Sequence, residues 1–158
     1  MRPGIDRDQF VKLAIVPGCQ ELGRALNRKL NTRSARQLLL VTAAVESNCG
    51  QYLKQIRGPA CGAFQEEPAT LKWVNEELYQ RGLTSYFRPD PLDITTDLVV
   101  AAIACRARYW LVPDALPEAD NAMHMWVYYK KWWNSSLGAT TRQKFMKAWE
   151  KWDVSTIK

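Results

Sequence analysis

LLLVTAAVES, residues Leu38–Ser47, is a strongly apolar run that ends in a glutamate and a serine. Ser34, with Gln37 three residues further on, has the spacing of a helix-capping box just before the run. Asn48 and Gly50 supply a helix stop directly after it. We therefore expect a largely buried helix that carries a carboxylic acid close to its C-terminal end.

The chain on both sides of this run shows helical spacing of apolar residues, which predicts a mainly α fold. Asp6 suits the cap of a first helix, which the Pro17-Gly18 pair is expected to end. Further helices are expected over residues 22–30, over 71–82, from a cap at Thr95 or Thr96 until Pro113, over 117–134, and from Thr140 or Thr141 onward. No strong period-2 alternation is present, so a short β-hairpin near residues 50–66 is the strand structure left open. The length and the lack of repeats predict a single domain over residues 1–158.

The composition is typical of a globular protein that buries a core, with 47% apolar and 24% charged residues. No segment approaches the ~18 consecutive apolar residues of a transmembrane helix, so we expect no membrane insertion. The first residues, MRPGIDRDQF, lack the apolar core of a signal peptide. We therefore expect that the chain itself encodes no export route.

The net charge of +6 favours an anionic partner, such as a nucleic acid, a membrane surface or an acidic cell-wall polymer. The basic residues are scattered, however, and no helix-turn-helix, zinc-finger or RNA-binding signature accompanies them. We therefore expect no nucleic-acid partner. A solvated basic surface is the simplest interpretation of most single basic residues.

Neither a cofactor nor a metal ion is expected. Cys19, Cys49, Cys61 and Cys105 show no CxxC spacing, and His124 is the only histidine. The phosphate-binding loop, the dinucleotide-binding fingerprint and the HExxH motif are also absent. We expect four reduced, mostly buried thiols, with a bridge between Cys49 and Cys61 as the alternative.

Glu46 is the acid with the most informative surroundings, because four of the five residues before it are apolar. Burial disfavours the charged carboxylate and raises its pKa, and the partial negative charge of a helix C-terminus acts in the same direction. Both effects favour a protonated acid near neutral pH, the state that protonates the leaving oxygen of a glycosidic bond. The alternative is a glutamate that turns out to solvent at the helix end.

Glu66 and Glu67 lie in the opposite setting, immediately before the helix start expected at Pro68. Free N–H groups at a helix N-terminus favour negative charge, so an ionised carboxylate is expected there. Such a carboxylate, of Glu66 or of Glu67, can stabilise an oxocarbenium-like transition state or orient water. The alternative is ordinary helix capping.

Two further segments are candidates for sugar binding. The small-residue loop Gly62-Ala63-Phe64-Gln65 allows close approach of its backbone to a sugar, and Gln65 can donate and accept hydrogen bonds. The later segment WVYYKKWWN, residues 126–134, is rich in aromatic residues on which sugar rings stack. Its two lysines favour anionic glycans. Part of these aromatic residues is expected in the core.

Together these residues resemble a known pattern. Glu46-Ser47, then the loop from Gly62 to Gln65, then Pro68 and Thr70 are similar to the ES…GxxQ…P-x-T signature of soluble lytic transglycosylase-like and goose-type lysozyme-like domains. The central part looks most like small bacteriophage members of this lysozyme-like superfamily. The likeness extends over residues 34–138.

The resemblance implies a mainly α, lysozyme-like domain that cleaves the β-1,4 bond between N-acetylmuramic acid and N-acetylglucosamine in peptidoglycan. It implies Glu46 as the general acid/base, and Tyr128 or Tyr129 as the tyrosine of the family's Ala-Tyr-Asn motif. The residues expected to bind substrate are Ser47, Gly62, Phe64, Gln65, Tyr128 and Tyr129. A hydrolase needs a further base or nucleophile, for which Glu67 is the candidate, whereas a transglycosylase can work with Glu46 alone.

The partners implied are the glycan strands of peptidoglycan and, if the chain is part of a phage particle, other virion proteins. The expected location is the phage virion, or the host cytoplasm before release to the periplasm as an endolysin. The alternative is a catalytically inactive structural protein of the tail, baseplate or neck that keeps the lysozyme-like fold, because fold does not fix function.

Overall fold

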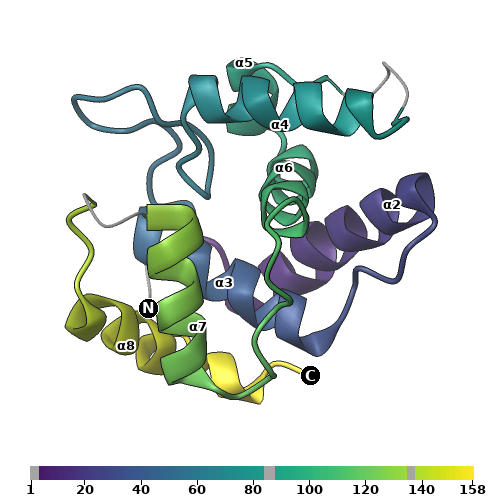
Figure 1. Cartoon of the computed structure of the whole chain (residues 1–158). Helices are drawn as coiled ribbons and strands as arrows, with labels where there is room; N and C mark the ends of the chain where they lie inside the picture. The colour runs from purple at the N-terminus through teal and green to yellow at the C-terminus, as the bar shows by residue number, and fades with distance from the viewer. Residues whose placement is uncertain (1–3, 84–87, 135–137) are drawn as a thin grey trace.

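The structure is a computed structural model that describes residues 4–83, 88–134 and 138–158 (Figure 1). Its elements in chain order are α1 (Arg7–Phe10), the π-helical turn η1 (Val11–Ile15), α2 (Val16–Leu26), α3 (Arg33–Ser47), α4 (Pro68–Gln80), α5 (Pro91–Thr96), α6 (Leu98–Trp110), α7 (Ala122–Tyr129), the π-helical turn η2 (Lys130–Asn134), α8 (Arg142–Lys151) and the 3-10 turn η3 (Val154–Thr156). The prediction of a mainly α fold is confirmed. None of the helices in the described ranges has the length and apolarity that a membrane span requires.

Helix α3 lies at the centre of the molecule (Figure 1), and its apolar run is buried on every side. Residues 38–43 are completely shielded from solvent. Thr42, the polar residue among them, donates to the carbonyl oxygen of Leu38 at 2.7 Å and shares a hydrogen bond of 2.8 Å with the hydroxyl of Tyr109. A helix that is apolar all round must be covered all round. The neighbours α6, α7, α8 and η1 supply that cover.

The start of α3 differs from the prediction. Thr32 is the N-cap and accepts a hydrogen bond from the N–H of Ala35 at 3.2 Å, so the capping box expected at Ser34 and Gln37 is wrong. Gln37 is instead fully buried, where its amide donates to Asp120 Oδ1 at 2.9 Å and accepts from the N–H of Asp120 at 2.8 Å. A buried amide needs both partners, and this tertiary contact replaces the local one.

The first helix continues through Pro17 and Gly18, where the sequence predicted an end. α1, η1 and α2 follow one another without a gap from Arg7 to Leu26. Pro17 lies in the first turn of α2, directly after a π-helical turn. Because the hydrogen-bond pattern changes at this turn, no backbone hydrogen bond requires the N–H that proline lacks. Gly18 allows close packing on α6, since a Cβ there would lie 2.8 Å from the Cβ of Ala102.

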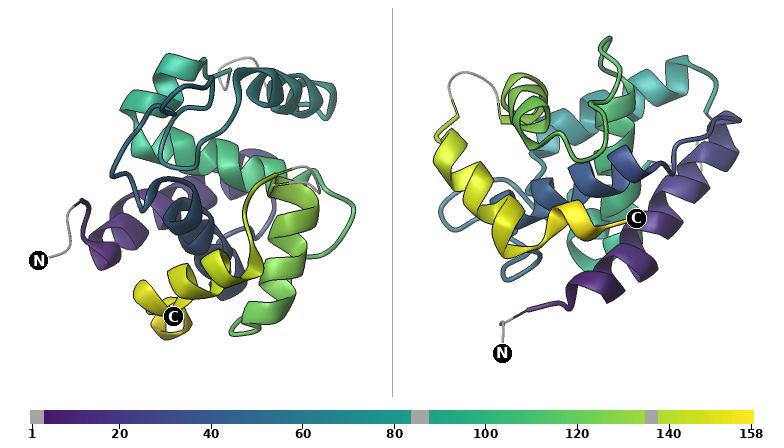
Figure 2. Two further views of the ribbon diagram at one scale, coloured as in Figure 1. Left: turned by 90° about the vertical axis from the view of Figure 1, so that its left-hand side faces the viewer. Right: turned by 90° about the horizontal axis from the view of Figure 1, so that it is seen from below.

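Two groups of helices lie on opposite sides of α3. α4 and α5 are on one side, and α7 and α8 are on the other, as Figure 2 shows in its left-hand view. A large apolar cluster surrounds α3, and a smaller one fills the space between α2, α4 and α6. The site described below lies where the C-terminal end of α3 meets the second group.

Residues 48–67 connect α3 to α4 without a regular strand. Two isolated antiparallel bridges, Lys54 with Cys61 and Cys61 with Glu66, are the β structure of this segment. The second bridge has both backbone hydrogen bonds, at 3.0 and 2.9 Å. The hairpin left open near residues 50–66 is therefore reduced to single paired residues, because glycine and proline residues interrupt the pairing.

All four cysteines are free and buried, so no bridge joins Cys49 to Cys61. Burial raises the pKa of the Cys19 thiol to about 11 and that of Cys49 to about 12. Thiols of this kind are unreactive and behave as small apolar side chains.

Candidate active site

Glu46 lies in the last turn of α3, where the central helix approaches the surface. Its side chain is partly exposed, and its Oε1 accepts a short hydrogen bond from the hydroxyl of Tyr129 in α7. Burial raises the pKa of the Glu46 carboxyl, while the Tyr129 hydrogen bond and the charges of Lys144 and Arg108 oppose the rise. The pKa remains above the ordinary value, which is the condition for a general acid.

Tyr129 is fixed by packing and by a hydrogen-bond chain. Its ring packs against Phe145, with the ring centroids 5.3 Å apart. Its hydroxyl lies 3.4 Å from Thr140 Oγ1, which in turn accepts from Asn134 Nδ2 at 3.2 Å. Burial, and then the neighbouring Glu46, raise the pKa of Tyr129, so its hydroxyl stays a hydrogen-bond donor.

Ser47 joins the end of α3 to the loop that begins at Gly62. It is completely buried, and its hydroxyl donates to the carbonyl oxygen of Ala63 and accepts from the N–H of Gly50 at 2.8 Å. Because the hydroxyl is engaged on both sides, Ser47 is placed to position this loop beside Glu46. A direct contact with substrate, as the resemblance implies, is not open to it in this arrangement.

The loop is held by the residues that the sequence nominated for substrate binding. Gly62 has a φ of +80°, and a Cβ there would lie 2.5 Å from the carbonyl oxygen of Ile94, so glycine is required. Gln65 donates from Nε2 to the carbonyl oxygen of Gly62 at 2.9 Å. Phe64 is buried and packs on Phe10, with centroids 6.0 Å apart. The side chains of Phe64 and Gln65 therefore stabilise the loop from within.

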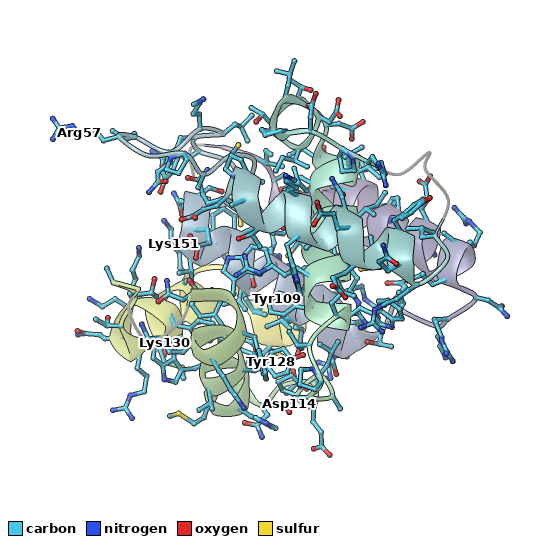
Figure 3. All side chains as sticks on the ribbon, turned by 45° about the horizontal axis from the view of Figure 1, so that its top comes forward. Arg57, Tyr109, Asp114, Tyr128, Lys130 and Lys151 are labelled. Carbon is cyan, nitrogen blue, oxygen red and sulfur yellow. The ribbon has the colours of Figure 1, made fainter. Side chains whose placement is uncertain are left out.

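Tyr128 points away from Glu46, although it precedes Tyr129 in the chain. Its hydroxyl donates to the carbonyl oxygen of Asp114 at 3.1 Å and approaches that of Tyr109 at 3.5 Å. Figure 3 shows Tyr128 near Asp114. Successive residues of a helix point about 100° apart, so only one of two adjacent tyrosines can face the acid. Of the two tyrosines left open by the sequence, the structure brings Tyr129 to the site.

The two acids before α4 lie in different environments. Glu67 is exposed and is the N-cap residue of α4, but its side chain makes no capping hydrogen bond. Glu66 is 2% exposed, and its Oε1 has no hydrogen-bond partner among the described residues. Burial raises the pKa of Glu66 to about 7 against the opposing charge of Arg108. The prediction of an ionised carboxylate at the helix N-terminus is wrong for Glu66, because its side chain is turned into the core.

Arg108 of α6 is a further member of the site that the motifs do not reveal. Its charge lowers the pKa of both Glu46 and Glu66. Its guanidinium donates to the carbonyl oxygen of Trp133 at 2.8 Å and lies 3.9 Å from the centre of that ring. The available signal is an arginine inside an apolar helix, because a partly buried charge requires acids, carbonyls or rings around it.

Three surface hollows lie outside the contact between Glu46 and Tyr129. A hollow of about 260 Å³ lies between α3 and α8 and is lined by Val45, next to Glu46 in the chain. Two larger hollows, of about 570 and 620 Å³, lie along the N-terminal helices. Neither Glu46 nor Tyr129 lines any of these three hollows. Within the described ranges, no group of three or more His, Cys, Asp or Glu side chains is placed to hold a metal ion.

Comparisons with known proteins assign no family to this geometry. No protein-family model, no curated protein and no solved structure gave a significant match to the chain. The resemblance to lysozyme-like domains therefore stays a prediction from the quoted motifs. Function has to be argued from the chemistry of the site.

The arrangement around Glu46 has the groups that general acid/base chemistry requires. One carboxyl group of raised pKa meets a tyrosine hydroxyl that fixes its orientation. The same group can give a proton to a leaving oxygen and accept one in a later step. The charges of Lys144 and Arg108 stabilise the carboxylate after the proton has left.

Proposed function

We propose that this chain is a peptidoglycan-cleaving glycosidase, which acts on the β-1,4 bond between N-acetylmuramic acid and N-acetylglucosamine. The observation that carries the proposal is the partly buried carboxyl of Glu46, of raised pKa and hydrogen bonded to Tyr129. The motif resemblance supports the choice of substrate. The net charge of +6 suits an acidic wall polymer.

In the first step, protonated Glu46 donates its proton to the glycosidic oxygen. The bond between C1 and that oxygen breaks through an oxocarbenium-like transition state, and the leaving sugar departs with the proton as a hydroxyl. Glu46 is then a carboxylate, which the hydroxyl of Tyr129 and the nearby cations stabilise. Burial thus favours the protonated carboxyl before the step, and the polar neighbours stabilise the carboxylate that the step produces.

The second step follows one of two routes. In the hydrolytic route, water attacks C1 and a carboxylate, Glu46 or Glu67, takes its proton. In the transglycosylase route, the sugar's own hydroxyl attacks C1, Glu46 takes the proton, and the product has an anhydro end. Both routes require Glu46, so the identity of the acid does not depend on the choice between them.

The proposed setting is a bacteriophage. The enzyme would open the wall during entry as part of the virion, or act from the host cytoplasm as an endolysin after release. Glycan strands are the proposed partner, together with other virion proteins in the first setting. The rival is a structural virion protein with the same fold and no activity.

Digestion of isolated Gram-negative sacculi separates an active glycosidase from an inactive structural protein. Purified wild type should release soluble fragments, whereas Glu46→Gln, which keeps the shape and loses the transferable proton, should not. Glu76→Gln, on the exposed side of α4, is the matched control and should digest at the wild-type rate. A wild type that digests nothing, or a Glu46→Gln variant of equal activity, contradicts the catalytic proposal.

A further inference from the structure

The hollow between α3 and α8 is lined by three lysines of one helix face. Lys144, Lys147 and Lys151 follow one another at spacings of three and four residues, so their side chains share one side of α8. Asn48 and Tyr52 form the opposite wall. The floor is apolar and includes Ala44, Val45 and Ala148.

This hollow adjoins the proposed acid. Tyr52, in one wall, donates from its hydroxyl to the main-chain oxygen of Glu46 at 2.8 Å. Lys144, in the other wall, lies near enough for its charge to lower the pKa of Glu46. The hollow thus adjoins the main chain of Glu46, while the carboxyl of Glu46 lies outside its lining. A polymer that extends from this carboxyl across the end of α3 would bring its neighbouring groups to the hollow.

The positive charge of the hollow is not compensated by the protein. No acidic side chain lines it, and none of the three lysines forms an ion pair with a carboxylate of the described residues. Lys151 donates to the side-chain oxygen of Asn48 at 2.9 Å, which is a neutral partner. Like charges at helical spacing repel each other, and an apolar floor strengthens the field that they produce.

We propose that this hollow binds the acidic stem peptide of peptidoglycan through its carboxylates, beside the bond that Glu46 cleaves. The inference rests on the proposed function for the identity of the glycan. A stem peptide presents several carboxylates on a flexible chain, and three mobile ammonium groups can meet them without a fixed geometry. The hollow thereby selects glycan strands that still carry their peptides.

Binding to the Glu46→Gln variant tests this without the need for turnover. The probes are a soluble disaccharide–tetrapeptide muropeptide with free carboxylates and the same compound with its carboxylates amidated. The free form should bind about tenfold more tightly, as expected for two or three partly exposed charge pairs. Adding Lys147→Gln and Lys151→Gln should reduce the difference to about twofold, because only Lys144 remains, while adding the exposed control Lys72→Gln should leave it intact.

The conservative pair Lys147→Arg and Lys151→Arg keeps the charges and should keep the difference, which separates loss of charge from loss of folding. Equal affinity for the two probes, or a difference that both Gln changes leave undiminished, overturns the inference. A short DNA duplex that competes as well as the acidic muropeptide also overturns it, because the surface would then bind any polyanion.

The two proposals fail separately. If wild type digests sacculi and the probes bind equally, only the peptide site is lost. If the probes differ as expected and the chain digests no sacculi, the peptide site is supported and only the catalytic role is lost.

Discussion

Glu46 and Glu66 are two carboxylic acids whose pKa values the charge of Arg108 lowers, yet the fold holds them in opposite ways. Glu46 is partly exposed and bonded to Tyr129, whereas Glu66 is 2% exposed and its Oε1 has no partner among the described residues. Burial raises both pKa values. The difference teaches that a raised pKa alone does not mark a catalytic acid; access and an orienting partner do.

The largest expected effect is on turnover. Glu46→Gln should lower kcat/KM for sacculus digestion by about a thousandfold, because it removes the general acid. Its thermal stability at about pH 4, where the wild-type carboxyl is also largely neutral, should stay near that of wild type, since the amide oxygen still accepts from Tyr129. Dye release from labelled sacculi and thermal unfolding measure the two quantities. An equal loss of activity in Glu66→Gln would erase the contrast between the two acids.

The next effect is on stability, and it belongs to Glu66. The folded protein keeps this proton up to a pKa of about 7, whereas the unfolded chain releases it near the ordinary value of 4.5. Between these values the native state binds more protons than the unfolded state. The free energy of unfolding therefore falls as pH rises through this window and levels off above it, by a total of about 3 kcal/mol.

Glu66→Gln removes this loss, because the amide does not ionise. Its free energy of unfolding should exceed that of wild type at about pH 8, and the two should approach each other at about pH 4. Urea unfolding at several pH values measures this. The raised pKa of Glu46 also lowers the free energy of unfolding as pH rises. The Glu46→Gln variant therefore measures the contribution of Glu46 to this pH dependence. A wild type whose stability is flat from acid to neutral pH would show that Glu66 is not buried as described.

A smaller effect is expected at the partner of the acid. Tyr129→Phe should lower kcat/KM by about tenfold, since the orienting hydrogen bond is lost. That hydrogen bond lowers the pKa of Glu46, so its loss should also move the alkaline limb of the pH–rate profile to higher pH. A lower rate with an unmoved limb would indicate only a structural role for Tyr129.

The smallest effect is expected at the neighbouring tyrosine. Tyr128→Phe should leave kcat/KM within about twofold of wild type and cost about 1 kcal/mol of stability, because its hydroxyl donates to the main chain of Asp114. Sacculus digestion and urea unfolding provide the two values. A loss of activity comparable to that of Tyr129→Phe would place Tyr128 in the site after all.

The central helix could be predicted from the sequence because its burial is written in consecutive apolar residues. Its N-cap could not be predicted, since Gln37 forms hydrogen bonds with Asp120, which lies far away in the chain. The continuation of the first helix through Pro17 was also beyond sequence patterns. It depends on a π-helical turn and on the packing of Gly18 against α6.

The residues of the site likewise fall into those that local sequence patterns predict and those that long-range packing determines. The sequence nominated Glu46 from its apolar neighbours and its motif, both of which are local. The choice of Tyr129 over Tyr128 depends on how α7 is rotated towards α3, and the burial of Glu66 depends on its pairing with Cys61. Long-range packing fixed these features, so local patterns could at most offer both tyrosines and both acids.

Mass spectrometry of the fragments released from sacculi tests the central claim most directly. With wild type, we predict new N-acetylmuramic acid ends, either anhydro or reducing, and with Glu46→Gln we predict none. Wild-type fragments without new glycan ends, or new ends at the same rate from Glu46→Gln, would contradict the assignment of Glu46 as the acid of a peptidoglycan glycosidase.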